Sequence, residues 1–157
     1  MTEARTELRE RFSEAEWSDS HGQDVVRLSR EQLLEFCNAA LEAGFEVLAD
    51  ITAVDWYRTR TPRFDVVINI LSMQHRRRLR ILVGVPDGDP MVPSLVPIWP
   101  GANFGEREVY DMFGVTFDGH PDLTRILMPD DWEGFPLRKD FAVGAVPVQF
   151  KASHQVN

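Results

Sequence analysis

The hydrophobic pattern of this chain changes at Gly114, and this change constrains the fold more than any other feature of the sequence. Before Gly114 the apolar residues recur with the spacing of helices and strands, whereas glycine or proline interrupts residues 115–157 every few positions. That second segment is nevertheless rich in Trp, Phe, Leu and Met, and contiguous exposed apolar surface usually marks a contact. We therefore predict an extended segment that either wraps its own domain or lies on a partner.

The periodic part predicts helices and strands in the order α-β-α-β-β-β-α. The helices are expected at residues 3–16, from Ser29 to Gly44 and from Asn103 to Gly114, and the strands at residues 24–28, 45–55, 63–73 and 78–85. This order favours an α+β fold, a two-layer sandwich of helices on a mixed, mostly antiparallel sheet, with an extended irregular C-terminal tail. We divide the chain into an α+β domain, residues 1–114, and a C-terminal segment, residues 115–157.

Local signals predict where the helices begin and which faces they bury. Capping-box spacing marks two helix starts, at Ser29 with Gln32 and at Asn103 with Glu106. Glycine follows each of these helices, at the position where a left-handed C-terminal residue is favoured. The helix after Ser29 is expected to bury a broad apolar face made of Leu33, Leu34, Phe36, Cys37, Ala40 and Leu41.

Composition excludes several classes of site. Cys37 is the only cysteine, so this chain alone forms no disulfide framework and no cysteine-based zinc or iron–sulfur centre. The N-terminal residues are charged from Glu3 onward and lack the apolar stretch of a secretory signal. No run approaches the roughly 18 apolar residues that would cross a bilayer.

Charge is distributed unevenly along the chain. The formal net charge is −8, yet residues 58–80 contain seven arginines and one aspartate. This basic stretch is either a solvated face or a docking surface for an acidic partner, steered by charge complementarity. Because its acidic flanks would repel phosphates, we expect no nucleic-acid partner, although Trp56 and Tyr57 lie nearby in the sequence.

The sequence contains no recognised catalytic motif. It lacks a P-loop, a dinucleotide-binding glycine motif and a nucleophile elbow. Glu108 and Asp111 are three residues apart and are predicted to share a helix face. A metal or acid–base site could be assembled from Glu108, Asp111, His120 and Asp131. The alternative is that three arginines pair with these acids and hold the irregular segment together, namely Arg107, Arg125 and Arg138.

The segment 101–141 carries the most specific signal, and it reads GANFGEREVYDMFGVTFDGHPDLTRILMPDDWEGFPLRKDF. This segment resembles the signature region of the 30-kDa, or C, subunit of respiratory complex I, the proton-pumping NADH:quinone oxidoreductase. The matching pieces are ERE at 106–108, YDMFG at 110–114, GHPDL at 119–123, RIL at 125–127, PDDWEG at 129–134 and PLRKDF at 136–141. With DITAVD at 50–55, the resemblance covers residues 25–141; the family usually has a basic residue where Thr124 stands.

The resemblance implies a structural subunit that binds no cofactor of its own. FMN, the iron–sulfur clusters and the quinone would belong to other subunits of the complex. The expected partners are peripheral-arm subunits, chiefly the D (49-kDa) subunit and also the B and I subunits. The implied location is the cytoplasmic face of the plasma membrane, with membrane attachment only through the complex.

Two other functions remain open at the level of sequence. The chain could be the equivalent subunit of an energy-converting hydrogenase or of a deazaflavin-dependent dehydrogenase, because the electron input lies on other subunits. It could also be a stand-alone metal-dependent enzyme built on the acidic cluster described above.

The resemblance also implies roles for individual residues. None is expected to be catalytic or to bind a metal or cofactor. The residues expected to meet a partner or to lock the tail are Glu106, Arg107, Glu108, Tyr110, Asp111, His120, Asp122, Arg125, Asp130, Trp132, Phe135, Arg138, Lys139 and Asp140.

Overall fold

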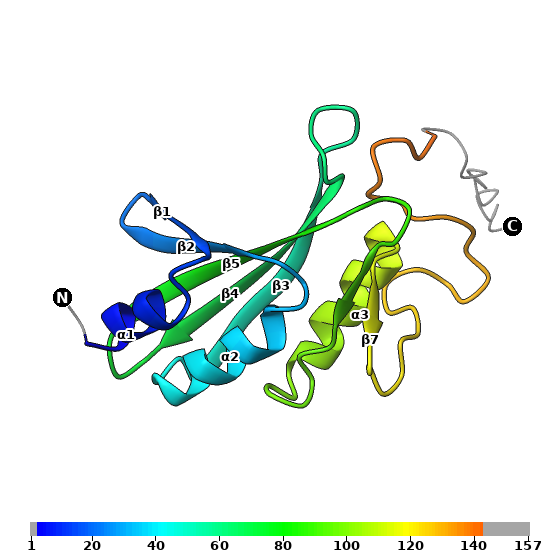
Figure 1. The fold of residues 1–157 in the computed structure, drawn as a ribbon. Helices are drawn as coiled ribbons and strands as arrows, with labels where there is room; N and C mark the ends of the chain where they lie inside the picture. Colours follow the sequence, from blue (N-terminus) through cyan, green and yellow to red (C-terminus); the bar gives the residue numbers. More distant parts are fainter. Residues whose placement is uncertain (1–2, 143–157) are drawn as a thin grey trace, which may run out of the picture.

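A five-stranded sheet carries three helices on one of its faces (Figure 1). The computed structural model describes residues 3–142. In chain order the elements are α1 (Glu3–Arg11), β1 (Glu16–Ser20), β2 (Gln23–Leu28), α2 (Leu33–Glu42), β3 (Val47–Asp55), β4 (Phe64–Ser72), β5 (Arg77–Val85), β6 (Met91–Pro93), α3 (Ala102–Phe113) and β7 (Thr116–Asp118). The predicted α+β sandwich is therefore confirmed.

The strand order in the large sheet is β1-β2-β5-β4-β3. Its β2–β5 pair is parallel and its other three pairs are antiparallel, which confirms a mixed, mostly antiparallel sheet. The predicted hairpin of β4 and β5 is also confirmed, with Ile68 opposite Ile81. The short strands β6 and β7 form a separate parallel pair that was not predicted.

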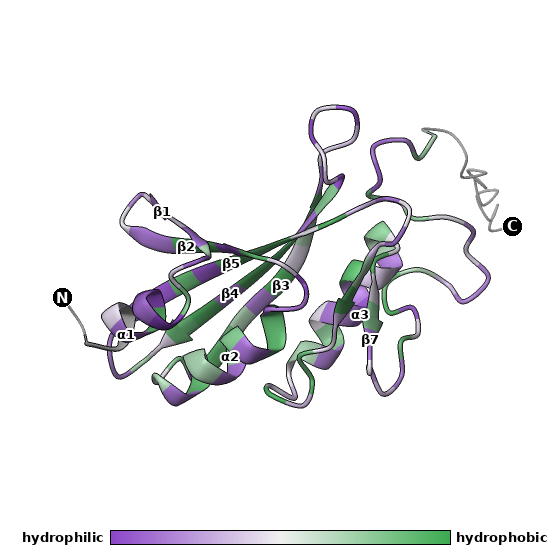
Figure 2. Ribbon diagram, in the orientation of Figure 1, coloured by the Kyte–Doolittle hydropathy of each residue, from purple (hydrophilic) through white to green (hydrophobic). Residues whose placement is uncertain are grey.

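The core lies between the helices and the inner face of the sheet. Every second residue of β4 and β5 points into it, and Phe64, Val66, Ile68, Ile81 and Val83 are at most 1% exposed. Figure 2 shows the apolar colour along these central strands and on parts of α2 and α3. The alternation of apolar and polar residues in the sequence therefore reports correctly which strand face is buried.

Helix α3 packs on the edge strand β3 through Gly105. A Cβ atom at Gly105 would lie 3.2 Å from the Cβ of Ile51, which is tighter than an ordinary van der Waals contact. The glycine therefore sets how closely α3, which carries several of the predicted site residues, approaches the sheet.

Several predicted element boundaries are wrong. The first helix ends at Arg11, and the unpredicted strand β1 begins at Glu16; in β1 only Trp17 and Ser20 are half-buried and the other residues are exposed. In α2 the two outer members of the predicted apolar face are 39% exposed (Leu34) and 38% exposed (Leu41). The core instead takes Ala39, so the buried stripe is narrower than the sequence indicated.

The two predicted capping boxes have different outcomes. The backbone N–H of Ser29 donates to the Oε1 of Gln32 (3.1 Å), which is one half of the expected box, although α2 begins only at Leu33. The second box is wrong: α3 begins at Ala102 with Gly101 as N-cap and has no side-chain cap. Glu106 does not reach back to the helix start because its carboxylate is used elsewhere, as described below.

The ends of both helices follow the prediction. Gly44 follows Ala43, the C-cap of α2, and has a φ of 85°, and Gly114 caps α3 with a φ of 72°. No helix within residues 3–142 combines the length and the apolar character needed to cross a bilayer.

Candidate functional site

The segment that follows α3 returns along that helix and ends near the loop between β3 and β4 (Figure 1). After β7 it contains no further helix or strand up to Ala142. It contacts three clusters of buried side chains, which we call the Asp111, Glu106 and Arg63 clusters after their central residues. Residues 143–157 of the predicted tail lie outside the described residues.

The Asp111 cluster holds the middle of the segment. Asp111 is fully buried on α3, and its Oδ2 accepts the backbone N–H groups of Ile126, Leu127 and Met128 at 3.1, 2.8 and 2.8 Å. Its Oδ1 accepts the guanidinium of Arg125 at 2.6 Å. Burial pushes the pKa of Asp111 upward, but the Met128 N–H, Arg125 and the other two N–H groups outweigh it and hold the pKa below its usual value.

Arg125 extends this cluster further along the chain. Besides Asp111 it donates to the carbonyl oxygens of Trp132 and Gly134, both at 3.0 Å. One arginine therefore closes the loop between residues 125 and 134 against α3. A charged donor forms stronger hydrogen bonds than a neutral one. The Asp111–Arg125 ion pair therefore defines the path of a segment that has no regular backbone hydrogen bonds of its own.

The Glu106 cluster lies at the other side of α3. Glu106 is fully buried and accepts the Ser94 hydroxyl at 2.7 Å and the Leu95 N–H at 2.6 Å. The His120 Nε2 is 4.0 Å from Glu106, and the Nδ1 of the same ring accepts the Asp122 N–H at 3.0 Å. Burial raises the pKa of Glu106 in spite of the Ser94 and Leu95 hydrogen bonds.

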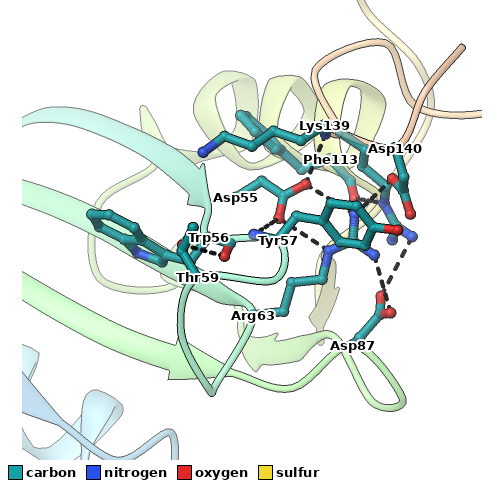
Figure 3. A network of polar contacts seen from close by, with 10 residues as sticks. Asp55, Trp56, Tyr57, Thr59, Arg63, Asp87, Phe113, Lys139 and Asp140 are labelled. Carbon is teal, nitrogen blue, oxygen red and sulfur yellow. Dashed lines mark hydrogen bonds and ion pairs between the residues drawn. The ribbon is translucent and has the colours of Figure 1, made fainter.

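The Arg63 cluster fastens the end of the described segment to the sheet (Figure 3). Arg63 is 8% exposed and binds both carboxylate oxygens of Asp55, at 3.0 and 2.9 Å. The same guanidinium reaches Asp87 at 3.0 Å and Asp140 at 2.7 Å. A single arginine thus connects the end of β3, the loop after β5 and the C-terminal segment.

Asp55 receives two backbone donors in addition to Arg63. The N–H groups of Tyr57 and Lys139 donate to its two oxygens, both at 2.9 Å. Burial opposes ionisation, but Arg63 and these N–H groups lower the pKa of Asp55 to about 2. The carboxylate is therefore ionised at neutral pH and ties the Lys139 backbone to the sheet.

Aromatic rings and Arg138 complete the attachment. The Arg138 guanidinium lies 4.7 Å from the ring centroid of Phe135 and 5.1 Å from that of Phe64, and its Nε donates to the Phe113 carbonyl. The Leu137 N–H donates to the Met112 carbonyl at 3.0 Å. The C-terminal end of α3, whose last carbonyl groups lack helical partners, is therefore capped by the returning segment.

The structure gathers most of the predicted site residues but not all of them. Arg107 donates to the carbonyls of Thr124 and Arg125, at 3.1 and 3.0 Å, so it binds the segment's backbone and not a carboxylate. The Tyr110 ring lies edge-on to Phe135 at 6.2 Å between centroids. The side chains of Glu108, Asp122 and Asp130 are exposed and make no hydrogen bond or ion pair within the described residues.

The predicted pairing of arginines with acids is correct in part. Arg125 pairs with Asp111, whereas the acid nearest Arg138 is Asp87 at 3.7 Å. The prediction that Glu108 and Asp111 share a face is wrong, because Asp111 is buried against the segment while Glu108 faces outward. Within residues 3–142 no three His, Cys, Asp or Glu side chains are grouped so that they could hold a metal ion.

Four residues of these clusters are not singled out by the sequence: Asp55, Arg63, Asp87 and Ser94. Asp55 and Arg63 stand out there only as the ends of two strands. A usable signal was present, because charges of opposite sign at the facing ends of adjacent antiparallel strands form a cross-strand pair. Asp87 and Ser94 lie in loops, and nothing in their local sequence distinguishes them from solvated polar residues.

Apolar side chains on the outside of this region remain in contact with solvent. Large hydrophobic residues of α3 and the following segment are 64% exposed (Phe104), 61% exposed (Leu127), 54% exposed (Leu137) and 37% exposed (Ile126). Trp132 stacks on Phe141, with 6.4 Å between centroids, and its buried Nε1 finds no acceptor within the described part of the chain. The clusters therefore bind the backbone of the segment while several of its apolar side chains face solvent.

Comparison with known proteins identifies the family. Residues 26–146 match the profile of the respiratory-chain NADH dehydrogenase 30-kDa subunit. The chain belongs to this family. The resemblance of the 101–141 segment is therefore confirmed, and the family region contains all three clusters.

Curated relatives of the 30-kDa family agree with this assignment. The C subunit of the NADH-quinone oxidoreductase of Nocardioides sp. is 47% identical over 133 residues, 83% of this chain and 53% of the relative. That of Saccharopolyspora erythraea is 44% identical over 84% of this chain and 54% of the relative. The chain thus spans about half the length of these relatives, although it covers 85% of the corresponding protein of Geobacter metallireducens at 43% identity.

Solved structures share the fold of this 30-kDa family member. A trypsin-resistant fragment of Nqo5 superposes with a TM-score of 0.70 at 37% identity, covering 76% of this chain and 97% of the fragment. A chain of the membrane-bound sulfane sulfur reductase, an archaeal respiratory membrane complex, gives a TM-score of 0.81 over 99% of this chain and 97% of its own. At 23% identity this second likeness shows a shared fold only.

Proposed function

We propose that this chain is a structural subunit of the peripheral, quinone-reducing arm of a proton-pumping NADH:quinone oxidoreductase. It would carry no redox group, with FMN, iron–sulfur clusters and quinone on other subunits. Its α+β domain, residues 1–114, would support the C-terminal segment, residues 115–157, which would lie on the D (49-kDa) subunit, with the B and I subunits as further neighbours. The complex would hold the chain at the cytoplasmic face of the membrane.

The observation that carries this proposal is an irregular segment tied to the domain by buried hydrogen bonds while its apolar side chains face solvent. The buried carboxylates of Asp111 and Asp55 accept backbone N–H groups of this segment, and that of Glu106 lies beside its His120. Leu127 and Leu137 nevertheless remain more than half exposed. A segment that served only its own domain would bury such side chains, because each one stabilises a core by about 1.5–3 kcal/mol. The 14 residues of the predicted interface divide accordingly into those that lock the segment and those that would contact a partner.

The proposed division of roles follows from burial. Residues that contact the segment or tie it to the domain would be tail-locking, and these are Glu106, Arg107, Asp111, His120, Arg125, Arg138, Lys139 and Asp140. Aromatic residues that pack on the segment would anchor the partner, namely Tyr110, Trp132 and Phe135. The exposed acids Glu108, Asp122 and Asp130 would form the polar rim.

The test is co-purification of the complex from detergent-solubilised membranes of cells carrying Leu127→Asp. The Leu127 side chain is exposed, and the substitution keeps the backbone N–H that donates to Asp111, so the chain should fold normally. Much less of the 49-kDa subunit should co-purify with it. Met73→Asp is the matched control, since Met73 is 67% exposed at the β4–β5 turn, outside this segment. Equal recovery of the 49-kDa subunit with both variants would disprove the interface.

A related complex remains the second candidate. A chain of the sulfane sulfur reductase complex shares the fold over nearly the whole chain. The fold alone therefore does not separate a complex I subunit from the equivalent subunit of an energy-converting hydrogenase or of a deazaflavin-dependent dehydrogenase. The same co-purification decides between them. A flavin-binding NADH-oxidising subunit among the partners supports the first proposal, and a nickel-containing large subunit supports the second.

A further inference from the structure

The sheet has a second face that no helix or strand of residues 3–142 covers (Figure 1). Side chains alternate across each strand, so those that do not enter the core point to this face. They line an open hollow of about 470 Å³ over β1 to β5. Arginines of the basic stretch, residues 58–80, contribute to this lining. The core and the tail clusters described above do not explain why they gather there.

An aliphatic stripe crosses this open face diagonally. Leu82 lies opposite Val67 in the β4–β5 pair, and these two form the centre of the stripe. Val25, which is only 6% exposed, lies two residues before the β2 partner of Leu82. Val54 lies two residues after the β3 partner of Val67. From Val25 to Val54 the stripe crosses three strand spacings and advances by four residues along the strands, so its length is about 20 Å. An α-helix of about 13 residues has this length.

Arginines border the stripe on both sides. On one side Asp65 pairs with Arg27 at 2.8 Å and with Arg60, and also accepts the Trp56 Nε1–H at 3.0 Å. The carboxylate is therefore already shared between two arginines, and this border keeps an excess of positive charge.

The opposite border contains Arg80. Its guanidinium donates only to neutral amides within the described residues, to Asn69 at 3.1 Å and to Gln23 at 3.3 Å. A smaller hollow of about 260 Å³ continues the surface past Arg80 to Arg78, with Asp50 as its one acidic member. Three arginines and one aspartate line the larger hollow, in a chain whose net charge is −8.

We propose that this face docks an amphipathic helix of a partner protein, with an apolar stripe bordered by glutamate or aspartate. A sheet face is normally buried by helices, and the inner face of this sheet is already covered in that way. The aliphatic stripe matches about three and a half helical turns, and its basic borders complement acidic flanks. This surface is separate from the tail clusters, so it does not depend on the function proposed above.

The test uses the purified full chain and a fluorescent 18-residue helical peptide whose leucine stripe is bordered by glutamates. Matched peptides carry glutamine or lysine in place of glutamate. Fluorescence anisotropy should show binding of the acidic peptide, about tenfold weaker binding of the glutamine peptide, and loss of the difference at high salt.

Charge reversal on the chain provides the matched control. Arg80→Glu should weaken binding of the acidic peptide about tenfold and improve binding of the lysine peptide, while Arg80→Gln should lie between. Arg77→Glu makes the same charge change three residues away, outside the lining of either hollow, and should have little effect. Circular dichroism of each variant checks the fold, and Leu127→Asp should bind the acidic peptide normally.

Three results would overturn the proposal. The first is equal binding of the three peptides, and the second is equal loss with Arg77→Glu and Arg80→Glu, which would indicate attraction by net charge alone. The third is tighter binding of single-stranded DNA than of the acidic peptide at the same face, which would replace a helical partner by a nucleic acid.

Discussion

Three buried carboxylates lie along the path of the returning segment, but within the described residues only Asp111 and Asp55 hydrogen-bond to it. Asp111 and Asp55 have lowered pKa values because N–H groups and arginines outweigh burial, whereas burial raises the pKa of Glu106, which meets no arginine. The first two are ionised ties to the segment, and the third is a buried hydrogen-bonding group beside His120. The number and charge of the donors, and not burial alone, decide the protonation of each.

Asp111→Asn tests the strongest of these ties. Asparagine keeps the shape but offers one acceptor oxygen instead of two, and it leaves the Arg125 charge unpaired. Removing one partner of a buried ion pair destabilises a protein by about 3–5 kcal/mol, so urea unfolding should show a loss of about 3 kcal/mol. Asp130→Asn, which changes an exposed acid, should alter the free energy of unfolding by less than about 0.5 kcal/mol. Equal effects of the two substitutions would contradict the assigned role of Asp111.

The lowered pKa of Asp55 predicts how the free energy of unfolding depends on pH. Its pKa is about 2 in the folded chain and 3.8 as an ordinary aspartate, so its contribution is complete above about pH 4 and is lost as the pH falls through about 2. This shift corresponds to about 2 kcal/mol of folding free energy. Urea unfolding of the chain and of Asp55→Asn should therefore differ most near neutral pH and converge toward pH 2. Parallel curves over that range would show that Asp55 is not the group responsible.

At the scale of elements, α3 is the support on which the returning segment is built. Its Glu106 and Asp111 each bind a different stretch of chain, and its C-terminal carbonyls accept donors from Leu137 and Arg138. The helix ends at Gly114, where the left-handed backbone redirects the chain toward β7. The segment therefore depends on where and how this helix ends.

Gly114→Ala should disrupt both the cap and the segment. The φ of Gly114 is 72°, and an added Cβ would lie 2.5 Å from the Phe135 ring. A left-handed conformation costs a residue with a side chain about 1–2 kcal/mol, and displacement of Phe135 adds to that cost, so the expected loss in thermal or urea unfolding is at least about 2 kcal/mol. Gly88→Ala is the control, because nothing lies within 4 Å of the added carbon. A loss of stability at Gly88 as large as that at Gly114 would contradict this explanation.

Much of the sheet and its helices could be predicted from the sequence, because their apolar residues follow the period of their own backbone. Strands β3, β4 and β5 fall within a residue or two of the expected ranges for this reason. Strand β1 was missed since Trp17 is its only large apolar residue and its other side chains are polar. The returning segment has no period at all, so its path is set by distant partners such as Asp111 with Met128 and Arg63 with Asp140.

The candidate site was recognised as a segment but not as a set of contacts. Family resemblance singled out Lys139 and Asp140, but their partners Asp55 and Arg63 lie 84 and 77 residues away in the sequence. Pairings of this kind come from tertiary packing, and spacing along the chain does not encode them. The wrong capping box at Asn103 has the same origin, since Glu106 turned to Ser94 instead.

At the scale of the whole molecule, the sheet separates two surfaces of different character. The helical side ends in the fastened segment with its exposed leucines, and the opposite side presents an aliphatic stripe between arginines. Each surface can select its own neighbour, one by apolar anchors and the other by charge. The two surfaces can therefore be tested independently.

Trp132→Ala tests whether the chain acts only through assembly. Trp132 stacks on Phe141, and its carbonyl accepts Arg125, so truncation removes an aromatic anchor but keeps the backbone contact. We expect less assembled complex in membranes and a fall in NADH:quinone activity in proportion to the complex lost. Trp132→Phe, which preserves a ring at this position, should retain most of both.

The decisive quantity is activity divided by the amount of assembled complex, measured on membranes from each variant. A structural subunit leaves this ratio unchanged, because none of its groups touches the electron path and the surviving complexes are intact. If assembly stayed normal while turnover per complex collapsed in Trp132→Ala, the segment would have a direct part in the reaction at the quinone site. The ratio therefore separates a scaffold from a participant, although Trp132→Ala would lower total activity in either case.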